Sequence, residues 1–180
     1  MRRAVRFVIV VVILLLAALT LRVLLWRPLS LADDSAPKNG LTHLSGIVHV
    51  HTTFSDGGGT PEEVIAAAQQ AGVSFLIITD HNNQGARKVA GYHSKLLVLV
   101  GIELSIEQGH IVALGIPDTL YRPPPFARDA LEDVAQLGGV AFAAHPMSPT
   151  PEFRWKRWDL PGSWGIEVLN ATANGVKPEA

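Results

Sequence analysis

The chain has 180 residues, no cysteine and a formal net charge of −1. The absence of cysteine excludes disulfides and thiolate metal sites, so any bound metal must take nitrogen and oxygen ligands. The length suits one domain with an appendage. Five of the 15 basic residues lie at or before Arg27, and all 16 acidic residues follow it. The chain after Arg27 therefore has a formal net charge of −6. This acidic body argues against broad nucleic-acid binding, and we expect no stable nucleic-acid partner.

Residues 1–27 predict an N-terminal membrane anchor. The run over residues 7–26 holds one charge, Arg22, and about 20 apolar residues can span a bilayer core as a single transmembrane helix. The arginines that precede this run favour a cytoplasmic N-terminus, so the remainder would lie outside the cytoplasm. The alternative is a signal peptide cleaved near residues 30–32, which would also export the remainder.

After a polar linker over residues 28–41, the body at residues 42–180 alternates between strand-like and helix-like segments. Strands are expected at residues 47–53, 74–79, 96–104, 111–116, 140–144 and 166–169. Thr60 and Glu63 form a capping box that begins one helix, and residues 126–137 form another; no element is assigned to residues 84–94. Continuous apolar strands separated by helices predict an α/β fold with a buried, largely parallel sheet. Ligands of such folds bind at the carboxyl ends of the strands.

His49 and His51 stand at the end of the first expected strand. Residues i and i+2 of a strand point to the same face, roughly 6.5 to 7 Å apart along it. Two imidazoles placed in this way can share a metal ion, and neutral imidazole is the commonest metal ligand. A pair of surface histidines is the plainer interpretation for these two residues taken alone.

The same pattern returns at the other strand ends. Of the seven histidines, all but His43 and His93 lie at such junctions, together with several carboxylates. The candidates are His49, His51, Asp56, Asp80, His81, Glu103, His110, His145 and Glu167. Alternatives remain for some: a salt bridge for Glu103, a strand-end surface histidine for His110, and a turn cap or orienting role for Asp80. Glu167 is expected to support a ligand or form a salt bridge rather than bind a metal.

Together, these motifs resemble the polymerase-and-histidinol-phosphatase (PHP) superfamily of metallohydrolases. They are His49-Val-His51 with Ser55-Asp56-Gly, Thr79-Asp80-His81-Asn82, Gly-Ile-Glu103, Gly-His110 and Ala-His145-Pro146. The resemblance implies a distorted (β/α)7 barrel that binds two or three divalent ions, Zn, Mn or Fe, at the carboxyl ends of its strands. It implies that His49, His51 and Glu103 bind one ion, that Glu103 bridges to a second ion held by His110 and His145, and that Asp56 and His81 hold a third.

The chain departs from the family in one respect. No Asp-x-His motif follows His145, although the family takes ligands from such a motif on a late strand. We therefore expect a C-terminally truncated barrel that lacks its final strand and helix. If residue 180 were the natural end, two of the ions would have too few ligands for catalysis to be expected.

The resemblance implies a phosphoesterase that hydrolyses phosphomonoesters or small nucleotides with a hydroxide that bridges the ions. His81 or His145 would donate a proton to the leaving oxygen, and Arg157 would offset charge on the phosphate. Residues 151–164 mix basic side chains with tryptophans and are expected to form a substrate loop, a peripheral flap or a membrane contact. A hydrolase of carbamate or carboxylic esters and a non-catalytic metal-binding module are the alternatives.

Overall fold

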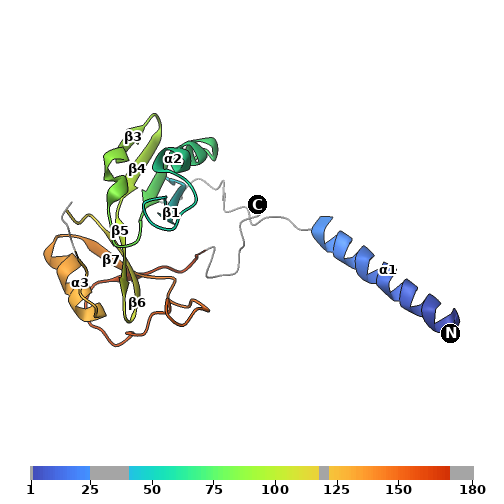
Figure 1. Cartoon of the computed structure of the whole chain (residues 1–180). Coiled ribbons are helices and arrows are strands. Elements are labelled where there is room, and N and C mark those ends of the chain that lie inside the picture. Colours follow the sequence, from blue (N-terminus) through green and yellow to red (C-terminus); the bar gives the residue numbers. More distant parts are fainter. Residues whose placement is uncertain (1, 25–40, 118–121, 171–180) are drawn as a thin grey trace. The chain divides into compact units, whose positions relative to one another are not determined.

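The computed structural model describes residues 2–24, 41–117 and 122–170 (Figure 1). The chain divides into two units, Met1–His43 and Leu44–Ala180. Helix α1 (Arg2–Leu24) forms the first unit's helix and contains most of the predicted membrane span. Among the described residues, however, no helix has both the length and the apolar character needed to cross a membrane, so the predicted transmembrane helix is not supported. The expected linker, but for residue 41, and the alternative cleavage site lie outside the described residues.

The first of two sheets in the second unit has the strand order β1-β2-β4-β3. Its members are β1 (Gly46–Val50), β2 (Phe75–Ile78), β4 (Leu96–Val100) and β3 (Gly91–His93). Strands β1, β2 and β4 run parallel, as predicted, whereas β3 pairs with β4 in the antiparallel direction. A 3-10 helix, η1 (Gly85–Val89), and β3 occupy the segment to which the sequence pattern assigns no element.

Helix α2 (Pro61–Gln70) covers this sheet and begins at the predicted capping box. The Thr60 side chain accepts a hydrogen bond from the Glu63 backbone at 3.2 Å, and the Glu63 carboxylate accepts one from the Thr60 backbone at 2.8 Å. Ile65 and Ala68 lie on the buried stripe of the helix and belong to the same core cluster as the sheet residues. Apolar burial and the capping box together explain why the helix forms here.

The second sheet has the order β5-β6-β7-β8 and is largely antiparallel. Its members are β5 (Ile102–Ile106), β6 (Gly109–Leu114), β7 (Val140–Ala144) and β8 (Gly165–Ile166). Helix α3 (Ala127–Gln136) contributes Ala130 and Val134 to its core. The prediction of a largely parallel sheet is wrong here, because a link as short as Glu107 and Gln108 can only join antiparallel strands, whereas a parallel pair needs a long crossover.

Gly101 divides the long strand expected over residues 96–104 into β4 and β5, one in each sheet. Figure 1 shows β4 leading directly into β5. A β-carbon at Gly101 would lie 2.6 Å from the Ala113 carbonyl oxygen and 2.5 Å from a Leu114 methyl group. The absence of a side chain therefore allows β6 to approach the point where the chain passes between the sheets. An isolated parallel bridge from His81 to Glu103 joins the sheets just beyond it.

The described strands form two open four-stranded sheets rather than a closed ring. The mixed α/β class is confirmed, but the distorted (β/α)7 barrel is not shown by these strands. Of the last predicted strand, residues 166–169, only Ile166 lies in a strand, β8, whose two residues pair with Phe142 and Ala143 of β7. The polar side chains predicted at the strand ends still meet at the junction of the two sheets.

Gly101→Ala should destabilise the full chain by roughly 1–3 kcal/mol, because the new methyl group overpacks a contact with backbone atoms. Gly58→Ala is the matched control, since nothing lies within 4 Å of a β-carbon there. We expect that control to change stability by less than about 1 kcal/mol. Chemical denaturation followed by circular dichroism measures both, and equal effects would contradict the close approach assigned to Gly101.

Candidate metal centre

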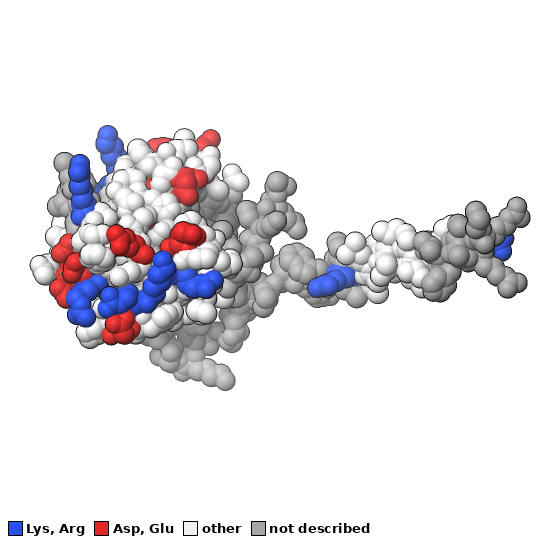
Figure 2. All heavy atoms as spheres, turned by 60° about the horizontal axis from the view of Figure 1, so that its bottom comes forward, with Lys and Arg blue, Asp and Glu red and all other residues white. Residues whose placement is uncertain are grey.

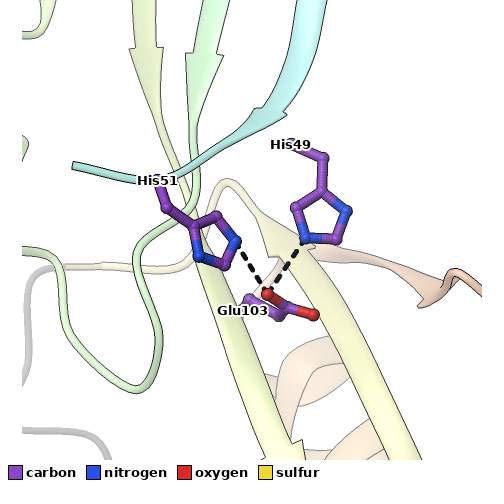
Figure 3. Close-up of side chains that lie close together, drawn as sticks. All are labelled: His49, His51 and Glu103. Carbon is purple, nitrogen blue, oxygen red and sulfur yellow. Dashed lines mark ion pairs between the residues drawn. The ribbon is translucent and has the colours of Figure 1, made fainter. Parts of the chain in front are cut away.

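The Glu103 carboxylate lies at the centre of the site, on β5, and its side chain is fully buried. Its Oε2 lies 3.0 Å from His49 Nε2 and 2.9 Å from His51 Nε2. Figure 3 shows both imidazoles extending from the first sheet toward this one oxygen. The sequence-based expectation that His49 and His51 converge therefore agrees with the geometry.

Three further histidines surround the same carboxylate. Glu103 Oε1 lies 2.9 Å from His110 Nδ1 and 2.8 Å from His145 Nε2, both in the second sheet or at its edge. His81 Nδ1, which follows β2, lies 3.4 Å from Glu103 Oε2. Five imidazoles from both sheets thus face one buried carboxylate.

The charges at this site perturb one another strongly. Burial raises the pKa of Glu103, but the hydrogen bonds from His110 and His145 and the nearby imidazoles of His49 and His51 outweigh burial and hold the pKa well below its usual range. Burial lowers the pKa of His49, yet the neighbouring carboxylates raise it to about 9. Glu103 is therefore ionised, and a buried carboxylate of this kind requires positive charge around it.

His49 reaches Glu103 through an irregular end of β1 rather than a regular strand. Its φ is 61°, in the left-handed region that few residues other than glycine adopt, and the pairing of β1 with β2 shifts register between Ile47 and Val50. The expected i, i+2 strand geometry is therefore replaced by a bulge, which re-aims the side chain. Glu167 lies 3.1 Å from His49 Nδ1 and accepts a 2.6 Å hydrogen bond from the His145 backbone. The Glu167 carboxylate orients the His49 ring through Nδ1, the nitrogen that does not face Glu103. The sequence predicts a supporting role of this kind for Glu167.

Asp56 supports the other side of the cluster. Its Oδ1 lies 2.6 Å from His51 Nδ1, and its Oδ2 lies 3.8 Å from His81 Nε2. The side chain of Asp56 is 68% exposed, so this part of the site faces solvent. The hydrogen bond from His51 lowers the pKa of Asp56, whereas burial lowers the pKa of His81.

A buried carboxylate, Asp80, fixes the loop that carries His51 and Asp56. Its Oδ1 accepts hydrogen bonds from the Thr52 backbone at 2.7 Å and the Ser55 hydroxyl at 2.8 Å. Its Oδ2 accepts one from the Thr52 hydroxyl at 2.8 Å. Asp80 thus orients a neighbouring loop. An orienting role is one of the two that the sequence predicts for Asp80, the other being a turn cap.

Strained backbone is concentrated at the centre. Of the four non-glycine residues with positive φ in the described ranges, three lie here: His49, Asn82 and His145. The Asn82 side chain accepts a hydrogen bond from the Ser105 backbone at 2.9 Å, and the Ser105 hydroxyl lies 3.2 Å from His81 Nδ1. Such conformations persist only where surrounding contacts enforce them, and they are typical of functional sites.

The donor set fits divalent metal ions. Three groups each offer ligand atoms within 4.8 Å of one another: His49, His51 and Glu103; His51, Asp56 and His81; and His81, Glu103 and His110. Glu103 Oε2 is buried and makes no well-aligned hydrogen bond among the described residues, although ring nitrogens lie close to it. Imidazole nitrogens and carboxylate oxygens suit Zn, Mn and Fe alike.

Arg157 is the candidate that the structure does not bring into the cluster. Its guanidinium donates two hydrogen bonds to Asp159, at 2.8 and 2.9 Å. Neither His43 nor His93 belongs to a metal-ligand group among the described residues. Phe153 instead contacts the imidazoles of His110 and His145. This contact cannot be predicted from the sequence, because it depends on the path of a loop. By contrast, Thr52 and Ser55 lie inside the first histidine motif, and short hydroxyl side chains at such positions are a sequence signal for hydrogen bonds that support the site.

The PHP domain family model matches residues 48–143, more than half of the chain. The chain belongs to the PHP family. An uncharacterized protein of Methanocaldococcus jannaschii is 28% identical over 143 residues, which cover 69% of this chain and 80% of that protein. The relatives with named activities are phosphoesterases, and at the family level this chain is an enzyme of the hydrolase class.

Two such relatives match a shorter part of the chain. The phosphoribosyl 1,2-cyclic phosphate 1,2-diphosphodiesterase of Eggerthella lenta is 38% identical over 39% of this chain and 30% of that enzyme. The 3',5'-nucleoside bisphosphate phosphatase of Chromobacterium violaceum is 37% identical over 38% of this chain and 27% of that enzyme. The matched part thus spans about a third or less of either enzyme.

Solved structures support the fold. A protein from Bifidobacterium adolescentis to which metal-dependent phosphoesterase activity is ascribed has a TM-score of 0.50 at 18% identity, covering 59% of this chain and 68% of that one. A two-domain protein from Bacteroides vulgatus with a PHP-like part has a TM-score of 0.50 at 21% identity, covering 68% and 39%. At these identities, the likeness establishes fold alone.

Glu103→Gln should weaken divalent-ion binding by more than about 100-fold, the upper end of the loss seen when groups outside the ligand shell are changed. The amide keeps the shape of the side chain but removes the charge on which the imidazoles converge. Titration calorimetry with Zn²⁺ or Mn²⁺ measures the affinity, and elemental analysis gives the stoichiometry. Glu62→Gln, an exposed change on α2, is the control, and equal affinity in both variants would refute the central role of Glu103.

Thr52→Val should destabilise the full chain by roughly 1–3 kcal/mol, since it removes a buried hydroxyl that donates to the buried Asp80 side chain. Thr53→Val changes the adjacent, exposed threonine in the same way and should have little effect. Thermal or chemical unfolding distinguishes the two variants. A Thr52 variant as stable as its neighbour would show that Asp80 does not depend on this hydrogen bond.

Proposed function

We propose that this chain is a metal-dependent phosphoesterase that acts on small phosphomonoesters or nucleotides. The observation that carries the proposal is the fully buried Glu103 carboxylate, which five imidazoles face from two sheets. The named activities of the E. lenta and C. violaceum relatives support phosphate esters as the substrate class.

Two or three divalent ions would occupy the centre, with Zn, Mn and Fe all compatible with its donors. In this proposal, His49, His51 and Glu103 hold one ion, and Glu103 with His110 and His145 holds a second. Asp56 and His81 hold a third, which the short distances from Asp56 to both His51 and His81 support. When bound, such ions lower the pKa of water to near 7 and offset charge on the phosphate.

The remaining roles belong to the protein's own side chains. Glu167 and Asp56 orient the rings of His49 and His51 through their Nδ1 atoms. His81 and His145 can donate a proton only through a ring nitrogen that does not bind an ion. His81 is the more accessible of the two, because its side chain is 26% exposed and that of His145 is 12% exposed. Arg157 uses two of its five N–H donors on Asp159, and the remaining donors can bind a phosphate oxygen.

A second function, hydrolysis of carbamate or carboxylic esters, is favoured by one observation. A phosphate-binding loop would be expected to direct a free arginine at the substrate. In this structure, Arg154 donates to the carbonyls of Ser148 and Pro149, while the apolar ring of Phe153 is the group that meets the histidines. The named activities of the relatives favour a phosphate ester as the substrate, whereas this loop favours an uncharged ester. The two classes of substrate must therefore be compared in the same assay.

The full chain loaded with Mn²⁺ or Zn²⁺ should hydrolyse para-nitrophenyl phosphate, and chelation should abolish this activity. Para-nitrophenyl acetate, with the same leaving group, tests the alternative, and absorbance of nitrophenolate follows both reactions. His43→Ala should behave as wild type in both assays, whereas His49→Ala should lose the activity. Turnover of the acetate alone would reject the phosphoesterase proposal, and turnover of neither by fully loaded protein would favour a non-catalytic metal-binding module.

A further inference from the structure

The loop that follows β7 is firmly anchored just after Phe153. Trp155 is 2% exposed and packs in the core of the second sheet. Its backbone donates to the Pro146 carbonyl at 3.2 Å, and that of Lys156 donates to Gln108 at 3.0 Å. The positions around Phe153 are therefore determined by core packing and backbone hydrogen bonds.

Phe153 itself is only partly covered. Its ring centroid lies 5.0 Å from that of His110, at an interplanar angle of 40°, and 6.0 Å from that of His145, at 57°. The residue remains 45% exposed. A large apolar ring held beside a polar centre and left half in water is the kind of surface that a ligand can cover.

The cationic side chains of this loop are already engaged. Arg154 donates to backbone carbonyls of the loop, Lys156 to the Glu107 carbonyl at 3.2 Å, and Arg157 to Asp159. The opposite side of the centre, by contrast, carries the exposed carboxylate of Asp56. The rim is thus apolar beside His110 and His145 and polar beside His51 and His81.

We infer that Phe153 is a specificity-determining residue that selects esters whose leaving group carries a flat aromatic ring. This inference rests on the proposed function for the placement of the ester at the metal centre. Aromatic pairs prefer offset or tilted arrangements with centroids 4.5–7 Å apart, and they gain more than their buried area alone provides. A ring on the leaving group would complete such a pair with the exposed part of Phe153.

The test compares two leaving groups of similar size, one flat and one puckered. Benzylphosphonate and cyclohexylmethylphosphonate cannot be hydrolysed, and their affinities for the metal-loaded full chain are measured by calorimetry. Wild type should prefer the benzyl ligand by about fivefold, within the range expected for an aromatic pair. Phe153→Leu should remove this preference while Phe153→Tyr retains it, and Tyr92→Leu, an exposed aromatic of β3 that is 77% exposed, is the control.

The corresponding benzyl and cyclohexylmethyl phosphates are tested as substrates. The ratio of kcat/KM for the benzyl ester to kcat/KM for the cyclohexylmethyl ester should fall by a similar factor in Phe153→Leu. Metal content is measured in each variant, so that loss of ions is distinguished from loss of the ring contact. Absence of a benzyl preference in wild type, or its persistence in Phe153→Leu, would overturn the inference even if phosphate esters are hydrolysed. A preference lost in Phe153→Leu without any turnover would support the inference and reject the proposed phosphoesterase.

Discussion

The structure of the second unit depends on one buried charge. Transfer of a carboxylate out of water costs several kcal/mol after relaxation, so Glu103 is stable only with positive charge or strong hydrogen-bond donors around it. Imidazoles surround the carboxylate from both sheets. His110 and His145 of the second sheet hydrogen-bond Oε1, and His49 and His51 of the first lie within 3.0 Å of Oε2. The same contacts that satisfy the carboxylate therefore hold the two sheets together at their junction.

The backbone allows this arrangement at a small number of positions. Gly101 lets the chain cross from one sheet to the other beneath Leu114, and the crossing places Glu103 beside the end of β2. The positive φ values of His49 and His145 then direct their rings inward. Each of these conformations costs free energy by itself, so each depends on the contacts that the centre provides.

The positions of these side chains at strand ends predict that they lie close together, because a side chain at the end of a buried strand must lie at an edge of a sheet. His49, His51, His81, Glu103, His110 and His145 all meet there. The pattern could not show that residues 96–104 bend at a glycine, since a continuous apolar run suits one long strand or two short ones equally. It also assigned phosphate contact to Arg157, whose nearest carboxylate is only two residues away, and local pairing of this kind is visible only when the loop has a conformation.

The choice of histidine rather than lysine or arginine around Glu103 has a physical consequence. Lysine and arginine would satisfy the carboxylate permanently, whereas an imidazole can donate a proton to it or bind a cation beside it. Metal ligands must be deprotonated, so ion binding at such a centre replaces protons with metal charge. Protonated imidazoles or bound ions can each compensate such a carboxylate. A buried arginine partner can compensate the charge too, but it has no acceptor atom with which to bind a metal ion.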